Sequence, residues 1–135
     1  MSVLGDNGLI SLLMLSAPGG KKRDEKFEKD LITGLISLIL LAVCDRSKEP
    51  MYGYQIAKEM EDSAETGVAL KQGTIYPVLR SMEKKGYLKS HLKASESGPP
   101  RKYYSITGKG RRKLEVWKEA WYRTESFVNS MVGVV

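Results

Sequence analysis

Residues 71–86 carry hydrogen-bond donors of the kind that contact nucleic acids. The polar side chains of this segment are Lys71, Gln72, Thr74, Arg80, Ser81 and Lys84. Lysine and arginine neutralise backbone phosphates, whereas a glutamine amide matches the N6 and N7 atoms of adenine in the major groove. Taken alone, such a set is more typical of a solvated surface helix, so the neighbouring elements have to decide between the two interpretations.

The spacing of apolar residues predicts that this segment is one short helix. Its apolar stripe consists of Ile75, Val78, Leu79 and Met82, which recur at helical intervals. Pro77 lacks an N–H and is best tolerated in a first turn, so we expect the helix to begin between residues 72 and 74, with Thr74 as its N-cap. Gly86 is expected to end the helix as its C′ residue.

Length and composition favour a single cytoplasmic domain. The chain has 135 residues, which suits one modest core. Its one cysteine, Cys44, permits no internal disulfide, and the apolar residues around it predict a buried thiol. The sequence contains no run of about 18 apolar residues that would predict a membrane helix. No cationic residue precedes the apolar segment 9–15, although a signal peptide has one there. We therefore expect no membrane partner.

The net charge of +6 is concentrated in one part of the chain. Residues 80–113 contain eleven Lys or Arg and two Asp or Glu, whereas residues 1–79 contain nine and eleven. Charge that serves only solubility is spread more evenly. This distribution therefore predicts a surface that binds a polyanion.

Two further helices are predicted before residue 71. Residues 27–44 are apolar nearly all round, which predicts a centrally buried helix, with a break at Gly34. Residues 52–60 form a shorter amphipathic helix, and its expected inner face consists of Tyr54, Ile56, Ala57 and Met60. A loop at residues 63–67 is expected to join this shorter helix to the helix in residues 71–86, and two short helices joined in this way are typical of a helix-turn-helix.

A basic hairpin is predicted directly after these helices. Residues 87–94 and 101–107 each alternate between apolar and polar positions, and residues 95–100 are rich in Ser, Gly and Pro. Tyr104 and Ile106 are expected on the inner face, whereas Arg101, Tyr103 and Ser105 are expected on the outer face. A hairpin after a recognition-type helix is the wing of a winged helix, and its basic face and the tip residues Arg101 and Lys102 suit DNA backbone contact.

A long helix is predicted to close the chain. Thr107 is expected to cap it. Leu114, Trp117, Trp121, Thr124, Val128 and Met131 then follow at alternating intervals of three and four. This seam predicts a dimerisation helix; the alternative is that both tryptophans pack on the chain's own first helix.

The predicted fold class is α+β and mostly α, a winged helix-turn-helix with a C-terminal dimerisation helix. Residues 1–26 are expected to be an N-terminal extension or arm. Residues 27–107 are expected to form the DNA-binding domain, and residues 108–135 the dimerisation helix.

Several motifs together resemble the PadR family of bacterial and archaeal transcriptional regulators. They are Tyr52-Gly53-Tyr54, Gly-Thr-Ile-Tyr-Pro-Val-Leu at residues 73–79, Met82-Glu83, Gly86-Tyr87-Leu88, Arg-Lys-Tyr-Tyr at residues 101–104, and Thr107 with Gly110. The single long final helix resembles the small subfamily. The resemblance implies a homodimeric repressor whose recognition helices enter adjacent major grooves of a pseudo-palindromic operator, about 34 Å apart.

The resemblance also implies which residues carry these roles. The expected DNA-binding residues are Lys71, Gln72, Gly73, Thr74, Tyr76, Arg80, Lys84, Lys89, Lys93, Arg101 and Lys102. The expected dimer contacts are the six seam residues of the final helix. Some small-subfamily members hold planar aromatic effectors between their subunits, which makes Trp121, with Trp117, the candidate effector site. The alternative there is a filled dimer core.

The sequence offers no catalytic constellation. The only histidine, His91, has no cysteine or acidic cluster around it for metal or triad chemistry, so we expect neither an enzyme nor a bound cofactor or metal. One competing interpretation is a winged-helix dimer that serves as a protein-interaction scaffold. The basic band at residues 80–113 disfavours it, because protein-binding surfaces are depleted of lysine.

Overall fold

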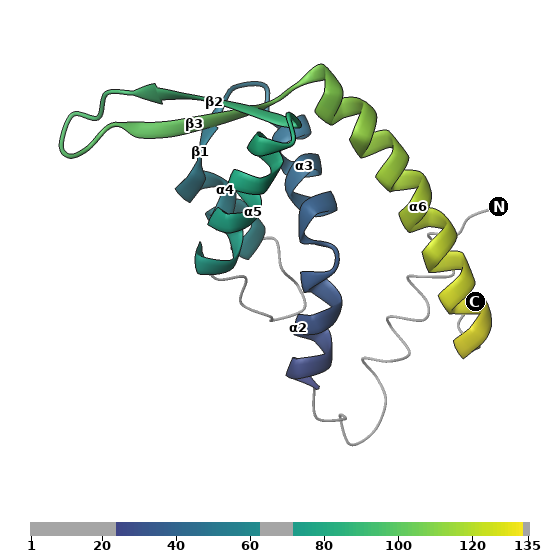
Figure 1. Ribbon diagram of the computed structural model, residues 1–135. Coiled ribbons are helices and arrows are strands. Elements are labelled where there is room, and N and C mark those ends of the chain that lie inside the picture. Colours follow the sequence, from purple (N-terminus) through teal and green to yellow (C-terminus); the bar gives the residue numbers. More distant parts are fainter. Residues whose placement is uncertain (1–23, 63–71, 134–135) are drawn as a thin grey trace. The chain divides into compact units, whose positions relative to one another are not determined.

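The computed structural model describes residues 24–62 and 72–133 (Figure 1). Its elements are α2 (Glu25–Thr33), α3 (Ile36–Arg46), β1 (Met51–Tyr52), α4 (Gly53–Asp62), α5 (Gln72–Lys84), β2 (Leu88–Lys93), β3 (Arg101–Ile106) and α6 (Gly108–Val132). The predicted class, mostly α with a small antiparallel sheet and a C-terminal helix, is confirmed. Residues Glu25–Glu119 form one compact unit. Residues 1–23 of the extension predicted at residues 1–26, the predicted loop at residues 63–67 and Lys71 lie outside the described residues.

The predicted break at Gly34 is confirmed, because the chain forms two helices there instead of one. Central burial is correct for α3, in which Leu40 and Leu41 are fully buried. The same prediction is wrong for α2, where Phe27 and Leu31 are 62% and 53% exposed. The physical reason is composition, because charged residues interrupt α2 on several sides whereas α3 is apolar nearly all round.

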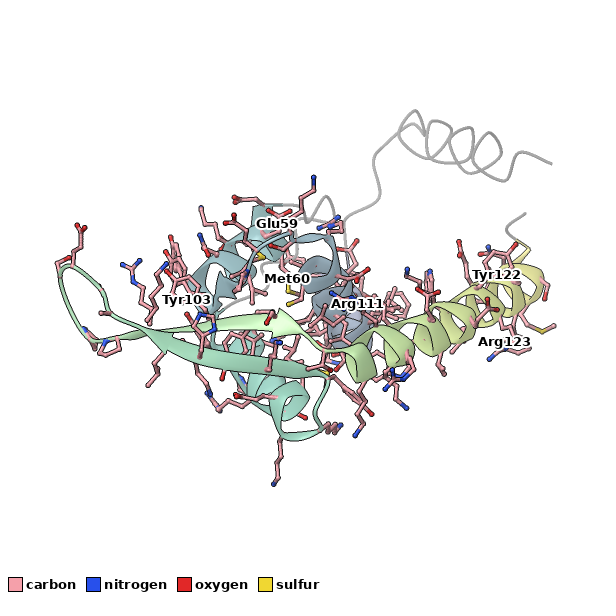
Figure 2. The ribbon with its side chains drawn as sticks, turned by 90° about the horizontal axis from the view of Figure 1, so that it is seen from above. Glu59, Met60, Tyr103, Arg111, Tyr122 and Arg123 are labelled. Atoms are coloured by element: carbon pink, nitrogen blue, oxygen red, sulfur yellow. The ribbon has the colours of Figure 1, made fainter. Side chains whose placement is uncertain are left out.

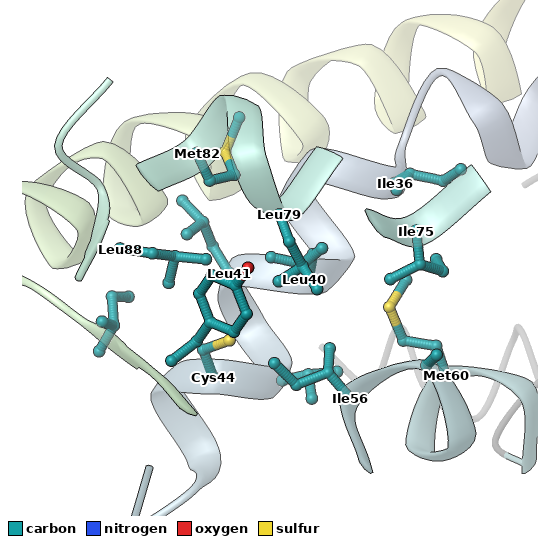
Figure 3. Close-up of a cluster of buried hydrophobic side chains, with 14 of the residues drawn as sticks. Ile36, Leu40, Leu41, Cys44, Ile56, Met60, Ile75, Leu79, Met82 and Leu88 are labelled. Atoms are coloured by element: carbon teal, nitrogen blue, oxygen red, sulfur yellow. The ribbon is translucent and has the colours of Figure 1, made fainter. Parts of the chain in front are cut away.

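The core lies between α3, α4, α5 and the sheet (Figure 3). Its largest fully buried side chains are Ile36, Leu40, Leu41, Ile56, Ile75, Leu79, Met82, Leu88 and Leu114. Burying one such side chain is worth roughly 1.5–3 kcal/mol. The prediction that Cys44 is buried is confirmed, and burial raises the pKa of its thiol to about 12. These contacts fix α5 against α3 and α4, and therefore fix the polar face that α5 turns outward.

The predicted inner face of α4 is correct except at Tyr54. Ile56, Ala57 and Met60 are buried, whereas Tyr54 is 44% exposed. Tyr54 lies two positions before Ile56, which places it about 200° around the helix from that buried residue. Tyr54 stacks instead on Tyr52, with ring centroids 5.9 Å apart.

The bounds of α5 agree with the prediction, whereas the roles predicted for Thr74 and Pro77 do not. The helix begins at Gln72, so Thr74 is its third residue instead of its N-cap, and Pro77 lies in the second turn instead of the first. At the other end Gly86 has a φ of +82°, a conformation that glycine adopts readily. The Tyr87 N–H donates to the Met82 carbonyl at 2.9 Å, which closes the turn expected after a C′ glycine.

The predicted hairpin is confirmed, and strand β1 pairs with it to form a three-stranded sheet. The sheet order is β1-β3-β2, and all pairs are antiparallel. In the hairpin Leu88 pairs with Ile106 and Lys93 pairs with Arg101. Strand β1 was not predicted, because two residues after Pro50 carry no periodic signal.

Thr107 caps the start of helix α6, as predicted, because its hydroxyl accepts the Gly110 N–H at 2.9 Å. The same hydroxyl donates to the Gly86 carbonyl at 2.7 Å, so it joins the end of α5 to the start of α6. Gly110 is required here, because an added Cβ would lie 2.1 Å from the Tyr87 carbonyl oxygen. None of the described helices has both the length and the apolar character to cross a membrane.

Candidate nucleic-acid interface

Helix α5 turns one polar face away from the core. Arg80 and Lys84 on this face are exposed, and so is Gly73 in the first turn. Tyr76 is only half-buried, and its ring packs against α4, since a Cβ added at Gly53 would lie 2.6 Å from Tyr76 Cε1. Gln72 is the first residue of the helix. The described residues that are predicted to contact bases therefore lie at the beginning of a helix that the core holds in place.

The outer face of the wing carries cations and aromatic rings. The register places Lys89 opposite Ser105, His91 opposite Tyr103 and Lys93 opposite Arg101. The predicted contacts Lys89, Lys93 and Arg101 thus lie on one side of the hairpin, which projects past α4 and α5 (Figure 1). All three side chains are exposed.

A row of rings crosses this face from strand to strand. The ring centroid of Tyr103 in β3, the residue labelled in Figure 2, lies 5.7 Å from that of Tyr52 in β1 and 5.8 Å from that of His91 in β2. Arg101 lies 4.7 Å above the Tyr52 ring, and Lys93 lies 5.6 Å above the Tyr103 ring. Such contacts restrict a cation without neutralising it. Sequence reasoning did not assign Tyr52 or Tyr103 to the site. For Tyr103 the available signal was its place on the same strand face as Arg101, whereas Tyr52 has no basic residue beside it in the sequence.

The inner face of the wing is fastened to α5 by Glu83. Lys102 Nζ lies 2.7 Å from Glu83 Oε1, and the Ser90 hydroxyl donates to Glu83 Oε2. The hydrogen bonds from Lys102 and then Ser90 lower the pKa of the Glu83 carboxyl from its ordinary value. The hydrogen bond to Glu83 likewise raises the pKa of Lys102. Lys102 was predicted as a tip contact for phosphate. It lies instead on the face opposite Arg101, already paired, with 44% of its side chain exposed.

A concavity of about 410 Å³ lies between α5 and the wing. It is lined by Tyr52, Gly53, Tyr54, Tyr76, Arg80, Arg101, Lys102 and Tyr104. These residues come from β1, the start of α4, the middle of α5 and β3. The concavity thus joins the two elements that carry most of the predicted DNA contacts.

Comparison with known proteins decides the family. The model of the transcriptional regulator PadR-like family matches residues 40–116. This chain belongs to the PadR-like family of transcriptional regulators. The match begins within α3 and includes α4, α5, the whole wing and the first part of α6, and it confirms the resemblance noted in the motifs.

Solved structures agree with the PadR-like assignment. A PadR-like transcriptional regulator from Bacillus cereus is 34% identical, with 76% of this chain and 96% of that chain covered and a TM-score of 0.62. A PadR family transcription regulator from Clostridium difficile is also 34% identical, covering 73% and 99%, with a TM-score of 0.61. A transcriptional regulator from Clostridium thermocellum is 30% identical, covering 76% and 95%, with a TM-score of 0.66.

Curated proteins include a relative without an assigned role. An uncharacterized protein from Lysinibacillus sphaericus is 29% identical over 101 residues, which covers 74% of this chain and 90% of that protein. The coverage shows that most of the PadR-like fold is shared with it.

The seam residues predicted for the PadR-like final helix fall into two groups. Leu114 is 1% exposed and belongs to the chain's own core. Trp117 is half-buried, and its ring meets Tyr87 edge-on at 5.8 Å. By contrast, Trp121, Val128 and Met131 are 39%, 45% and 68% exposed. The alternative that both tryptophans pack within their own chain therefore holds for Trp117, which packs against the core and contacts Tyr87, whereas Trp121 stays partly exposed.

Part of the basic band serves the PadR-like fold itself. Lys109 Nζ donates to the Lys85 carbonyl at 2.9 Å and so satisfies one of the last carbonyls at the end of α5. Lys109 and Lys113 also lie 5.5 Å and 5.6 Å from the centroid of the Tyr87 ring. Charge counting along the sequence could not separate these cations from those on the open faces of α5 and the wing.

Proposed function

We propose that this transcriptional regulator is a homodimeric repressor that binds a pseudo-palindromic operator in duplex DNA. Helix α5 enters the major groove and the wing follows the adjacent backbone. In this proposal residues 27–107 form the DNA-binding domain, and residues 108–135 form the dimerisation helix.

The observation that carries the proposal is the set of exposed, unpaired cations on α5 and the wing. Arg80 and Lys84 on α5 and Lys93 and Arg101 on the wing are all exposed. Within the described part of the chain none of the four pairs with an acidic side chain. Unpaired lysine and arginine are available to neutralise phosphates, which supplies most of the affinity for duplex DNA.

Base reading is assigned to the beginning of α5. A helix-turn-helix directs the N-terminal residues of its second helix at base edges. Gln72, Gly73, Thr74 and Tyr76 belong to the first two turns of α5, and Lys71 precedes them in the sequence. Gln72 is our candidate for reading adenine through its amide. In a duplex selected from a random library, Gln72→Ala should relax base preference at one position of each half-site. Lys93→Ala should instead weaken binding to all DNA sequences by the same factor. Equal loss on all sequences from Gln72→Ala would refute the assignment.

Dimerisation is assigned to the part of α6 that follows Glu119. Its exposed large apolar side chains are Trp121, Tyr122, Phe127, Val128, Met131 and Val132. So many exposed apolar side chains on one helix mark an interaction surface more often than a free one. Because Leu114 and Trp117 pack within their own subunit, the main contacts are assigned to Trp121, Val128 and Met131, with Thr124 between them.

An effector site is assigned to the Trp121 side chains of the two subunits. Indole faces stack well on planar aromatic compounds, and release of the operator would follow if the bound compound changed the spacing of the two α5 helices. Titration with planar cationic dyes should quench the fluorescence of Trp121. A Trp121→Phe variant reports the remaining signal of Trp117. Unchanged fluorescence at micromolar dye would remove the effector from the proposal.

The central test is a salt titration of binding to a random-sequence duplex. The logarithm of the association constant should fall steeply and linearly with the logarithm of salt concentration. Lys84→Gln and Lys93→Gln should each lower the slope by about one. Lys118→Gln, in α6 outside the basic band, serves as the matched control and should leave the slope unchanged. Absence of binding at low salt would instead favour the protein-interaction scaffold.

A further inference from the structure

We propose that the concavity between α5 and the wing seats one phosphate of the DNA backbone, which Arg80 and Arg101 hold jointly. This inference rests on the proposed function, because it presupposes that α5 and the wing meet one duplex. It adds that helix and wing share a single backbone contact at their junction, in addition to separate contacts along each element.

The two arginines approach the concavity from different elements. Arg80 comes from the middle of α5, and Arg101 comes from the first position of β3. Both line the concavity, and both are exposed. A guanidinium offers a planar fork of N–H donors that binds a phosphate through two oxygens. Two forks that line the same concavity from two different elements can therefore bind one phosphodiester together.

The third cation of the concavity is already neutralised. Lys102 lies 2.7 Å from the Glu83 carboxylate, whereas no acidic partner of Arg80 or Arg101 occurs among the residues that the structure describes. The positive charge left for a ligand is thus that of the two arginines. It matches a site for an anion of low charge, such as a phosphodiester.

The aromatic walls hold Arg101 in place and supply neutral donors. The Arg101 guanidinium carbon lies 4.7 Å from the centroid of the Tyr52 ring, a contact that leaves the donor edge of the fork free. Tyr54 and Tyr76 add phenolic groups, which donate hydrogen bonds to phosphate oxygens. Tyr104 is 5% exposed and lines the concavity from the inner face of β3.

The size of the site fits a backbone segment better than an isolated ion. About 410 Å³ is more than one phosphate occupies, and the concavity is open at the surface. A phosphate with its flanking sugars can therefore enter without leaving the strand. The contacts of Glu83 with Lys102 and Ser90 hold the wing in one position relative to α5. The backbone positions from which the two arginines extend are therefore set before DNA binds.

The test compares salt slopes for binding to a random-sequence duplex in four proteins: wild type, Arg80→Gln, Arg101→Gln and the double variant. The slope reports the number of neutralised phosphates at about 0.9 per phosphate. With a shared phosphate, each single variant keeps nearly the wild-type slope because the other arginine remains. The double variant then loses about 0.9. Affinity at fixed salt should fall about tenfold or more in the double variant.

The opposite results would overturn the inference. If the arginines bind separate phosphates, each single variant loses about 0.9 and the double variant about 1.8. If they bind none, all four slopes agree. Lys93→Gln combined with Arg80→Gln is the matched control, since Lys93 does not line the concavity and its replacement should lower the slope whether or not Arg80 is replaced. A wild-type protein without a salt-dependent slope would overturn the proposed function as well, so the two failures are distinguishable.

Discussion

Lys102 in the wing and Glu83 in α5 form an ion pair with Nζ and Oε1 2.7 Å apart. Ser90 in the other strand of the wing donates to the second oxygen of the same carboxylate. One acidic side chain of α5 therefore contacts both strands of the hairpin. Both members of the ion pair stay partly exposed, so its net stabilisation is at most about 1 kcal/mol. Its larger effect is to fix the direction in which the wing leaves α5.

Replacing Glu83 by glutamine should weaken DNA binding, although it removes a negative charge from a surface that meets phosphates. Electrostatics alone predicts the reverse, because less repulsion would tighten binding. The positional effect should prevail, with a loss of about threefold to tenfold, equivalent to roughly 1 kcal/mol for a partly exposed network. Fluorescence anisotropy with a labelled duplex measures the change.

Glu96→Gln provides the matched control for this variant. Glu96 lies in the exposed loop of the same hairpin, and its replacement removes the same charge without touching the Glu83 contacts. Binding of the control should stay unchanged or become slightly tighter. Tighter binding by Glu83→Gln, equal to that of the control, would show that Glu83 does not position the wing.

The Glu83 pair should also make stability depend on pH in the acid range. The hydrogen bonds from Lys102 and Ser90 lower the pKa of Glu83 from its ordinary value of 4.5. A carboxyl whose pKa is lower in the folded state stabilises the fold above its unfolded pKa and loses this contribution as pH falls through the folded value. Urea unfolding of wild type and Glu83→Gln should thus differ most above pH 4.5 and converge at lower pH. Parallel stability curves would contradict the lowered pKa.

Periodicity makes most of the fold predictable. Strands β2 and β3 alternate clearly, and α3, α4 and α5 each carry an apolar stripe, so their existence and approximate bounds follow from the sequence. Strand β1 is too short for any period to register. Within α5, Thr74 was wrongly predicted as the N-cap because Pro77 was assigned to a first turn, although the helix tolerates it in the second.

The positive charge of the candidate site can be predicted from the sequence, but the ion pair between Lys102 and Glu83 cannot. The alternation that put Tyr104 and Ile106 on the inner face also places Lys102 there, so the sequence contained the signal that this lysine differs from Arg101. Its partner Glu83 could not be found in this way, since the contact depends on how the hairpin lies on α5. The concavity likewise depends on four elements whose mutual placement no local pattern specifies.

Replacing Gly110 by alanine should destabilise the protein strongly. The new Cβ would lie 2.1 Å from the Tyr87 carbonyl oxygen, which is backbone and cannot move aside. Overpacking of this kind costs about 1–3 kcal/mol. Urea denaturation monitored by circular dichroism measures the loss.

Gly108→Ala is the matched control two residues earlier in α6. The nearest atom to a Cβ at Gly108 is the tip of the Arg112 side chain at 3.5 Å. Alanine should fit there, and its higher helix propensity should leave stability equal or raised by up to about 1 kcal/mol. A similar loss in both variants would show that the approach of α6 to Tyr87 is not what requires glycine.

Cys44 should react with thiol reagents only when the protein unfolds. Its side chain is 4% exposed, and burial raises the pKa of the thiol to about 12, so the reactive thiolate is scarce at neutral pH. Labelling with a chromogenic disulfide at pH 8 should be far slower in buffer than in 6 M urea. The rate in buffer should increase in the destabilised Gly110→Ala variant. Rapid labelling of the folded wild type would contradict the buried position of the thiol.

A charge placed on the exposed apolar side of α6 should separate the subunits of the proposed dimer. Val128 and Met131 are 45% and 68% exposed, and aspartate in a buried interface would leave an uncompensated charge. Val128→Asp should therefore elute as a monomer in light-scattering chromatography and bind duplex DNA more weakly, since one half-site contact is lost. Val116→Asp is the control, because Val116 is 58% exposed and lies off the seam of three- and four-residue intervals. If Val128→Asp remains dimeric, or if both variants dissociate, the seam is not the interface.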